Sequence, residues 1–530
     1  MVFTKDNEGV YDFLYIVSVL FAYGVLSLLL GQDSHGDVWN YHLYNGWSYL
    51  NNRLEWDLAP AGAHSFLNPY LDVLFYKCVS TTNGVVYTFF VGILQGLVVV
   101  PLLLIVRVFY SEKILAYVMT TLCCFGSTFF IGCLGLSTHD NLITVLVLIS
   151  FYLLLQYFKK NNFLFLSFSA FILGATIGLK LTASTYAVTF CGLVFLFSKG
   201  KIVRKFELFA FYSCVLLLGI GVTSGKWFYD LYSLYGNPLF PFYNNIFQSP
   251  FASLNGASTQ AMDFFQQTGL EHIFYPFFFA DHPERVASSA NSSQYLIYQP
   301  VFVLIACWTA LCMFYTRKTI DDRDRIILFF SIFLVLSYSV WQIFFGVYRY
   351  FLPTDILFPL LLFMFLEYSI KFRGVLSRGL TRLVVISLLV LSVGFQVLSG
   401  IPTWGRGDVT TPYFCGNIPS ELRQADVLFL GTYPSAWLIP VIEPIGHVAT
   451  VGGVFLDFAS DEYKSKYYQF SSKENNYLLL DSHLVVNLKK IEEELAFYNL
   501  QVDWNVKKEF SVRLSSHLKT IVYYKLKEIK

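Results

Sequence analysis

The sequence predicts an all-α polytopic membrane protein, with about eleven transmembrane helices, that ends in a small soluble α/β domain. Three observations support this fold class. Hydrophobic residues make up 55% of the 530 residues and charged residues only 14%, whereas about 25% of the residues in soluble domains are charged. Apolar runs of membrane-crossing length recur over residues 1–400. The pattern changes to short, strand-like runs over residues 401–530.

The charge and cysteine content exclude several classes of protein. The net charge of +1 does not provide the basic surface that a nucleic-acid partner requires. The nine cysteines form no Cys-x-x-Cys and no Cys/His spacing typical of zinc sites, and most fall within apolar runs, where cysteine behaves as a small hydrophobic residue. No disulfide framework or structural zinc is therefore expected. No cofactor is indicated, and a requirement for a divalent metal stays open.

A helix needs about 20 mostly apolar residues to cross the hydrocarbon core of a bilayer. We expect spans at residues 12–31, 85–106, 114–136, 142–158, 163–179, 181–198, 206–224, 297–316, 326–347, 351–370 and 383–400. The first run is too long for the core of a signal peptide and no small-residue cleavage site follows it, so it is expected to remain as an anchor.

The distribution of lysine and arginine predicts the orientation of these spans. One set of short loops is rich in basic residues: Arg107, Lys113, Lys159, Lys160, Lys199, Lys201, Arg204, Lys205, Arg317, Lys318, Arg323, Arg325, Lys371, Arg373, Arg378 and Arg382. The opposite loops hold few, although two of them are much longer. We therefore expect a cytoplasmic N-terminus and a C-terminal domain outside the cytoplasm.

The outer side carries the long segments, namely loops 32–82 and 225–295 and the tail. Long loops in compact folds tend to be functional, so we expect the outer face to be the working face. In the tail, residues 426–431, 477–480 and 520–525 are expected to be strands and residues 483–499 a helix.

The first outer loop contains the densest group of polar residues. Asp37 follows the first span, and Trp39, Leu43, Trp47, Leu50 and Leu54 recur at the spacing of an amphipathic helix, which we expect to lie along the membrane surface. A carboxylate there could take a proton from an acceptor hydroxyl while a lipid phosphate leaves. Alternatively, Asp37 only caps this helix.

Other polar residues of the outer loops are candidates for supporting roles. His42 lies a turn or so after Asp37 and could orient the carboxylate or donate a hydrogen bond. Asp33 is close enough to share the site, although solvation of the loop is the favoured interpretation. His139 and Asp140, in a short turn between two spans, could lie beside the first loop or simply cap the next helix.

Two cations stand at the predicted outer ends of spans. Lys180 is set within Gly-Leu-Lys-Leu-Thr (178–182), and its ammonium could bind the phosphate of a lipid-linked donor or extend to the interface. Arg349 and Tyr350 precede Pro353, and the planar guanidinium suits phosphate oxygens. Asp355 lies deeper and could pair with a cation or line a cavity.

The loop that begins at residue 225 is rich in aromatic residues. Its segment Gly-Asn-Pro-Leu-Phe-Pro (236–241) fixes a non-helical backbone. Asn237 among these rings is typical of a sugar-binding surface, since pyranose faces stack on aromatic rings. An interfacial loop packed on lipid headgroups has the same composition.

Together these features resemble the GT-C superfamily of integral-membrane glycosyltransferases, which use polyprenyl-phosphate-linked sugars. The resemblance rests on the acid directly after the first span, the amphipathic first outer loop, the number of spans, and segments 178–182, 236–241 and 349–353. It covers about residues 1–400 and is greater to uncharacterised bacterial members than to the mannosyl- or aminoarabinose-transferase branches. The acidic pair usual in the first loop is not contiguous here, because Asp33 and Asp37 are four residues apart.

The resemblance implies a bacterial inner (cell) membrane protein with an outer-face active site, a lipid-phosphate donor, Asp37 as general base, inversion at the sugar carbon and no nucleotide sugar. The expected partners are a polyprenyl-phosphate-linked sugar, the bilayer, and an envelope glycan, lipid or protein acceptor. Two alternatives stay open. One is transfer of a whole oligosaccharide, including protein O-glycosylation. The other is transport of a lipid-linked sugar, which would need more charged residues deep within the spans than Asp355, Glu207 and Glu367.

Overall fold

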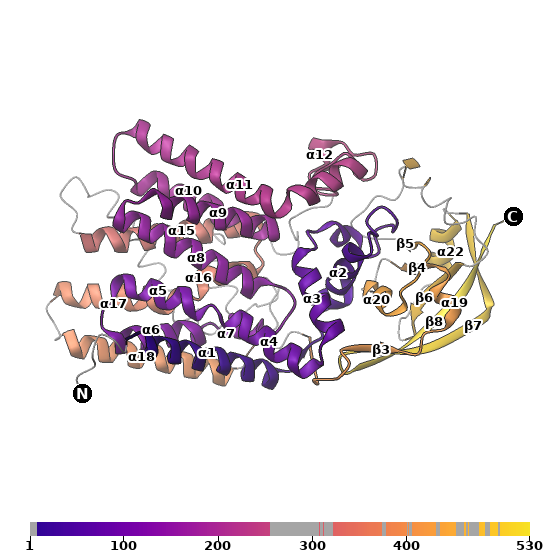
Figure 1. Cartoon of the computed structure of the whole chain (residues 1–530), viewed down its shortest axis with the longest axis horizontal. Coiled ribbons are helices and arrows are strands. Elements are labelled where there is room, and N and C mark those ends of the chain that lie inside the picture. The colour runs from indigo at the N-terminus through magenta and orange to yellow at the C-terminus, as the bar shows by residue number, and fades with distance from the viewer. Residues whose placement is uncertain are drawn as a thin grey trace.

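The computed structural model describes residues 8–254, 307, 311, 322–373, 378–399, 401, 405–430, 435–451, 461, 462, 465, 476–482, 488–496 and 499–529. Long helices lie side by side at one end of the molecule and a β-sheet forms the other end (Figure 1). The short helices of the first outer loop lie between these two parts. The predicted fold class, a helical membrane protein with a C-terminal domain that contains a sheet, is confirmed.

The helical part follows the predicted spans closely. Its described helices are α1 (Glu8–Leu30), α4 (Gly84–Gly96), α5 (Val99–Phe109), α6 (Lys113–Gly126), α7 (Thr128–Gly132), α8 (Asp140–Lys160), α9 (Phe163–Leu179), α10 (Ser184–Phe197), α11 (Ile202–Tyr235), α15 (Asp322–Phe344), α16 (Leu352–Asp355), α17 (Phe358–Arg373) and α18 (Arg378–Ser399). The span predicted at 297–316 lies outside the described residues, apart from 307 and 311.

Not every predicted span is one long helix. Among the described residues, four helices are long and apolar enough to cross a bilayer alone: Gly9–Leu30, Gly84–Phe109, Asp140–Lys160 and Ile202–Tyr235. The segments Tyr348–Asp355 and Phe358–Glu367 add a fifth if they form one span bent by 42°. The apolar helices at 113–126, 163–179, 181–197 and 328–344 are shorter. Pro353 lies in the first turn of α16, where it lacks the amide needed to continue the preceding helix.

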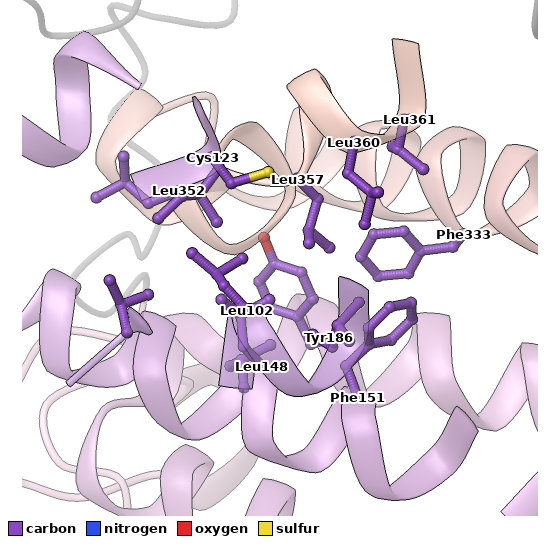
Figure 2. Close-up of a cluster of buried hydrophobic side chains, with 14 of the residues drawn as sticks. Leu102, Cys123, Leu148, Phe151, Tyr186, Phe333, Leu352, Leu357, Leu360 and Leu361 are labelled. Carbon is purple, nitrogen blue, oxygen red and sulfur yellow. The ribbon is translucent and has the colours of Figure 1, made fainter. Parts of the chain in front are cut away.

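The core of the helical part is built from leucine and aromatic side chains. Leu352, Leu357 and Leu360 lie opposite Leu102 and Leu148, with Tyr186 between them (Figure 2). Phe151 packs against Phe333 with ring centroids 4.6 Å apart. This packing fixes the broken segment after residue 348 against α5 and α8, so the backbone at the mouth of that span has a defined position.

Helices α9 and α11 approach closely through small residues. An added Cβ at Gly174 would lie 1.9 Å from the carbonyl oxygen of Leu216, and one at Gly219 would lie 2.3 Å from that of Phe171. Small residues allow helix backbones to approach in a membrane, where packing rather than the hydrophobic effect drives association. The contact fixes the C-terminal half of α9, which leads directly into Lys180.

The C-terminal domain contains a six-stranded mixed sheet of order β3-β7-β8-β6-β4-β5. Its strands are β3 (Phe414–Gly416), β4 (Asp426–Leu430), β5 (Val448–Val451), β6 (Asn476–Asp481), β7 (Leu500–Leu514) and β8 (His517–Glu528), and its described helices include α19 (Ser420–Arg423), α20 (Ile439–Ile442) and α22 (Leu488–Ala496). The three strands predicted at 426–431, 477–480 and 520–525 correspond to β4, β6 and β8. The helix expected within 483–499 corresponds to α22.

The first outer loop connects the two parts of the molecule. It contains the π-helical turn η2 (Val38–His42), α2 (Leu43–Leu50), the 3-10 turn η3 (Gly62–Phe66) and α3 (Tyr70–Thr81). At its start, the two-residue strand β1 (Gln32–Asp33) pairs with β2 (Arg406–Gly407) from the tail. Gly31 makes the turn from α1 with φ +96°, and an added Cβ there would lie 2.7 Å from the oxygen of Gly407.

The amphipathic helix predicted in this loop exists, but its expected place on the membrane surface is wrong. Trp39, Leu43 and Trp47 are buried in one apolar cluster with residues of the C-terminal domain. The indole of Trp39 meets that of Trp437 edge-on, with ring centroids 4.8 Å apart. The apolar face is therefore covered by protein, a tertiary contact that helical spacing does not predict.

Candidate functional site

Four charged side chains, far apart in the sequence, meet at the end of the helical part where α8 begins and α9 ends. Nη1 of Arg349 donates to Oδ2 of Asp37 at 2.7 Å, and Nε of Arg349 lies 3.6 Å from Oδ2 of Asp140. Nζ of Lys180 donates to Oδ1 of Asp140 and to the carbonyl oxygen of Thr138, both at 2.5 Å. Asp37, Arg349, Asp140 and Lys180, here called the charge cluster, thus form a chain of alternating sign.

Each member of the charge cluster stands where an apolar helix begins or ends. Asp37 follows α1 and β1, Asp140 is the first residue of α8, and Lys180 directly follows α9. Arg349 lies in the 3-10 turn η7 (Tyr348–Phe351) at the mouth of the broken span. Irregular backbone at membrane depth is tolerated where protein buries it or where it lines a cavity, so this arrangement is typical of a functional site.

Tyr350 connects the two cations of the charge cluster. Its ring centroid lies 5.5 Å from Nζ of Lys180 and 5.4 Å from the guanidinium carbon of Arg349. Both distances are within the range of cation–π attraction. Lys180 and Arg349, each a candidate from the sequence for binding the donor phosphate, thus lie beside one ring, and Lys180 pairs with Asp140 instead of extending to the interface.

Two polar atoms of the charge cluster have no hydrogen-bond partner although they are buried. They are Nε of Arg349 and Oδ2 of Asp140, and the 3.6 Å between them is too long for a hydrogen bond. Most buried polar atoms in folded proteins are paired. An unpaired donor on a buried guanidinium is therefore a position that an oxygen atom of a ligand could occupy.

The surroundings of Asp37 set its protonation state. Burial alone would raise the pKa of this carboxyl, but the positive charge of Arg349 and the neighbouring His35 and His42 outweigh burial and hold the pKa well below its usual range. Asp37 is therefore a carboxylate at neutral pH. While paired with Arg349 it is also a weak base.

The capping role considered for Asp37 is not observed, because its side chain forms no cap hydrogen bond to η2. Asp33, in contrast, does not solvate the loop as favoured from the sequence. It is fully buried, and it accepts hydrogen bonds from the backbone N–H of His35 at 2.9 Å and of Ser137 at 2.7 Å. Asp33 thus holds the first loop against the turn before α8, which brings Asp37 towards Asp140.

A second polar cluster lies beside the first. Oδ1 of Asp72 lies 2.6 Å from Nδ1 of His42 and 2.9 Å from Nε2 of His139, and all three residues are buried. His139 has a left-handed backbone with φ +63°, which costs a non-glycine residue about 1–2 kcal/mol. We call His42, Asp72 and His139 the His–Asp–His cluster. His42 and His139 were candidates from the sequence, whereas Asp72 was not.

The remaining predicted site residues lie elsewhere. Asp355 accepts hydrogen bonds from Ser127 and, at 2.7 Å, from the hydroxyl of Tyr348, so its described partners are hydroxyl groups rather than a cation. Asn237 donates to the carbonyl of Phe242 at 2.9 Å and accepts from the amide of Leu239 at 2.8 Å. These contacts stabilise its own turn.

The aromatic rings of the second long loop pack against each other. Tyr235 and Phe240 stack with centroids 4.4 Å apart, and Phe66 meets Phe240 edge-on. Trp227 is buried, and its indole N–H donates to the carbonyl oxygen of Phe66 at 3.0 Å. In the described part of this loop, these rings form a small apolar core and not an open sugar-binding surface.

Comparisons with known proteins agree with this architecture. No family model and no curated protein matches the chain. Among solved structures, the chain is similar to ArnT from Cupriavidus metallidurans bound to undecaprenyl phosphate, with a TM-score of 0.50, 12% identity, and coverage of 97% of this chain and 98% of that chain. The apo structure of the same protein gives a TM-score of 0.41 at 11% identity. The first similarity supports the predicted fold class, a helical membrane part followed by a domain that contains a sheet, over almost the whole chain.

Proposed function

We propose that this protein is a membrane glycosyltransferase that moves a sugar from a polyprenyl-phosphate donor to an acceptor hydroxyl on the outer face. The observation that carries the proposal is the meeting of Asp37, Arg349 and Lys180 in one cluster, with a guanidinium N–H left unpaired. The similarity in fold to a protein that was solved with undecaprenyl phosphate supports a lipid-phosphate donor.

The orientation of the cluster agrees with the outer face. Asp140 and Lys180 lie at the opposite ends of α8 and α9 from the basic residues Lys159 and Lys160. Arg107, which pairs with Asp12 near the start of α1, also belongs to that other side. The rule that basic loops face the cytoplasm therefore supports a position of the charge cluster on the opposite, outer side.

The chemistry needs a base, a route for the proton and stabilisation of the leaving group. In the proposed step, the Asp37 carboxylate takes the proton of the acceptor hydroxyl while that oxygen attacks the anomeric carbon. The bond between this carbon and the phosphate oxygen breaks, and the lipid phosphate leaves with the electron pair. Arg349 and Lys180 stabilise the negative charge that develops on the phosphate.

The pairing of Asp37 with Arg349 suggests how the donor activates the base. A donor phosphate would compete with Asp37 for the guanidinium and could accept from its unpaired Nε. Each hydrogen bond that Arg349 transfers to phosphate removes an influence that holds the pKa of Asp37 low. Asp37 becomes a stronger base only when donor is bound, which limits unproductive proton transfer in the free protein.

The test is transfer of a labelled sugar from polyprenyl phosphate in membranes that contain the full chain. Asp37→Asn keeps the size of the side chain and removes the base, so the rate should fall by about 10²–10⁴-fold. The matched control is Asp503→Asn, because Asp503 pairs with Lys527 on the sheet of the C-terminal domain and should retain full activity. A fully active Asp37→Asn variant would reject the proposed base.

The same assay distinguishes single-sugar transfer from transfer of a whole oligosaccharide. Mass analysis of the product shows whether one sugar or a complete repeat has been added. Uptake of a labelled lipid-linked sugar into vesicles without any product would instead favour a transporter. Both transfer reactions would use the contacts of the charge cluster, so the product decides between them, and it also identifies the chemical class of the acceptor (glycan, lipid or protein).

A further inference from the structure

We propose that the His–Asp–His cluster is a binding site for one divalent transition metal ion, with zinc as the best-fitting probe. This inference does not depend on the proposed sugar transfer, because metal binding can be measured without donor or acceptor. It goes beyond the sequence patterns, which showed no metal spacing. The three residues come from separate segments, so only the fold brings them together.

The positions of the ligand atoms carry the proposal. One ligand atom from each of His42, Asp72 and His139 lies within 4.8 Å of the other two, and both Nδ1 of His42 and Nε2 of His139 contact Oδ1 of Asp72. Around a tetrahedral zinc with bonds of about 2.0–2.1 Å, neighbouring ligand atoms stand roughly 3.3 Å apart. The distances from Oδ1 of Asp72 to the two imidazole nitrogens are 2.6 and 2.9 Å. To accommodate the ion, each would need to lengthen by less than about 1 Å.

The charge of the cluster supports a cation at this position. Asp72 is buried, and its described ion-pair partners are two imidazoles, with no lysine or arginine among them in the described residues. A buried carboxylate without a permanent positive partner is costly. In the charge cluster next to it, two cations already balance two carboxylates. A divalent ion would supply the positive charge that Asp72 lacks.

The ligand types select the class of metal. Two imidazole nitrogens and one carboxylate oxygen suit zinc and neighbouring first-row metals, whereas magnesium and calcium prefer oxygen ligands only. Three protein ligands leave a fourth position open. Side-chain exposure is 3% for His42, 4% for Asp72 and 11% for His139, so the fourth ligand is expected to approach past His139.

A bound ion would connect three elements of the fold next to Asp37, the proposed base. His42 ends η2, Asp72 lies in the first turn of α3, and His139 precedes α8. Because η2 begins directly after Asp37 and α8 begins with Asp140, the ion would fix the separation between the two carboxylates that face Arg349. Its role in this proposal is positional, and no reaction step passes through it.

The experiment uses the purified full chain in detergent, with any polyhistidine tag removed, after treatment with a chelator and dialysis. Zinc content is measured by mass spectrometry after addition of a slight excess, and affinity by competition with a zinc indicator. We expect one zinc per chain. His42→Asn, Asp72→Asn and His139→Gln should each lower the affinity by about 100-fold or more, since even indirect partners of metal sites contribute 10–100-fold.

The matched control is His64→Gln. His64 is in the same loop and stacks on Tyr41 with centroids 4.9 Å apart, but it is not one of the three ligands. This variant should still bind one zinc. If a ligand variant does not fold, cobalt(II) added to the unaltered chain should give the visible absorption of a nitrogen- and oxygen-ligated site, which zinc but not magnesium should displace.

Two results would overturn the proposal. The first is an unaltered chain that takes up no stoichiometric zinc and gives no cobalt absorption. The second is uptake that all three ligand variants retain or that His64→Gln abolishes equally. In either case the cluster would be a hydrogen-bonded network that only joins the loop segments, and the proposed sugar transfer would be unaffected.

Discussion

Arg349 lies between the carboxylates of Asp37 and Asp140, at 2.7 Å from one and 3.6 Å from the other. Arg349 is separated from each of these carboxylates by more than 200 positions in the sequence. One guanidinium thus connects the first outer loop to the start of α8. Its planar geometry allows contact with both carboxylates at once, which a lysine ammonium could not reproduce in the same way.

The first prediction concerns this guanidinium. Arg349→Gln should lower the turnover rate by about 10²–10³-fold, as loss of one preorganised donor to developing charge does in other enzymes. Arg349→Lys should recover only part of the rate, because the positive charge is kept but the planar guanidinium with its several N–H donors is lost. Steady-state transfer kinetics measure both. Lys527→Gln, at the Lys527–Asp503 pair on the distant sheet, serves as control, and a fully active Arg349→Lys variant would contradict the argument.

The second prediction concerns Asp33. Asp33→Ala would leave the amides of His35 and Ser137 without their acceptor, at a cost of about 1–3 kcal/mol for each. The melting temperature of the purified protein should therefore fall clearly. Asp33→Asn keeps one acceptor oxygen and should destabilise less. Equal melting temperatures for Asp33→Ala and the unaltered chain would show that the two hydrogen bonds contribute little.

The third prediction compares two glycines on α11 and its neighbour. Gly174→Ala would direct a methyl group at the carbonyl oxygen of Leu216, whereas Gly221→Ala meets no atom within 4 Å. Overpacking typically costs about 1–3 kcal/mol, so Gly174→Ala should lower thermal stability in detergent. Gly221→Ala should be neutral or slightly stabilising, because alanine favours a helix. The reverse order would mean that α9 and α11 do not pack as described.

The fourth prediction concerns pH. Burial lowers the pKa of His64, while Asp37 opposes this effect without cancelling it. A histidine whose pKa is lower in the folded than in the unfolded chain stabilises the fold fully above about pH 6.5, and the stability is lost as pH falls below that value. The melting temperature should therefore decrease between pH 7 and 5.5, and His64→Gln should reduce the slope.

Proton linkage limits the size of this effect: the free energy of unfolding can change by no more than about 1.4 kcal/mol per pH unit for each histidine. Measurements in the presence of a chelator keep it separate from metal binding. Asp37 does not contribute in this window, since its pKa is lowered and its ion pair is lost only at far more acidic pH. An unchanged slope in His64→Gln would assign the acid sensitivity to other groups.

The sequence singled out Asp37, Lys180 and Arg349, which the structure brings together, because charges directly beside apolar spans are costly and therefore stand out. It missed Asp72, which the buried positions 72, 75 and 79 on one face of α3 could have indicated. A carboxylate on the buried face of an amphipathic helix is a signal for a partner, although the sequence alone does not say which histidines supply it.

The helices were predictable because apolar length and basic loops depend on local composition. The burial of the first outer loop by the C-terminal domain could not be predicted in this way, because Trp39 contacts Trp437 from a distant part of the sequence. For the same reason the aromatic residues near Tyr235 suggested a sugar surface, although Tyr235, Phe240 and Phe66 pack on each other. Composition indicated that rings gather there, but only tertiary structure determines which faces they present.

The hydroxyl of Tyr413 donates to the backbone oxygen of Asp33 across 380 residues of chain. The first outer loop is synthesised well before its partners in the C-terminal domain, so these contacts form only after the intervening spans have been made. Contacts of such large sequence separation form late during folding. The spans can thus be inserted before the first outer loop acquires its cover from the C-terminal domain, and a chain that stalls between the two would be inserted with that loop uncovered.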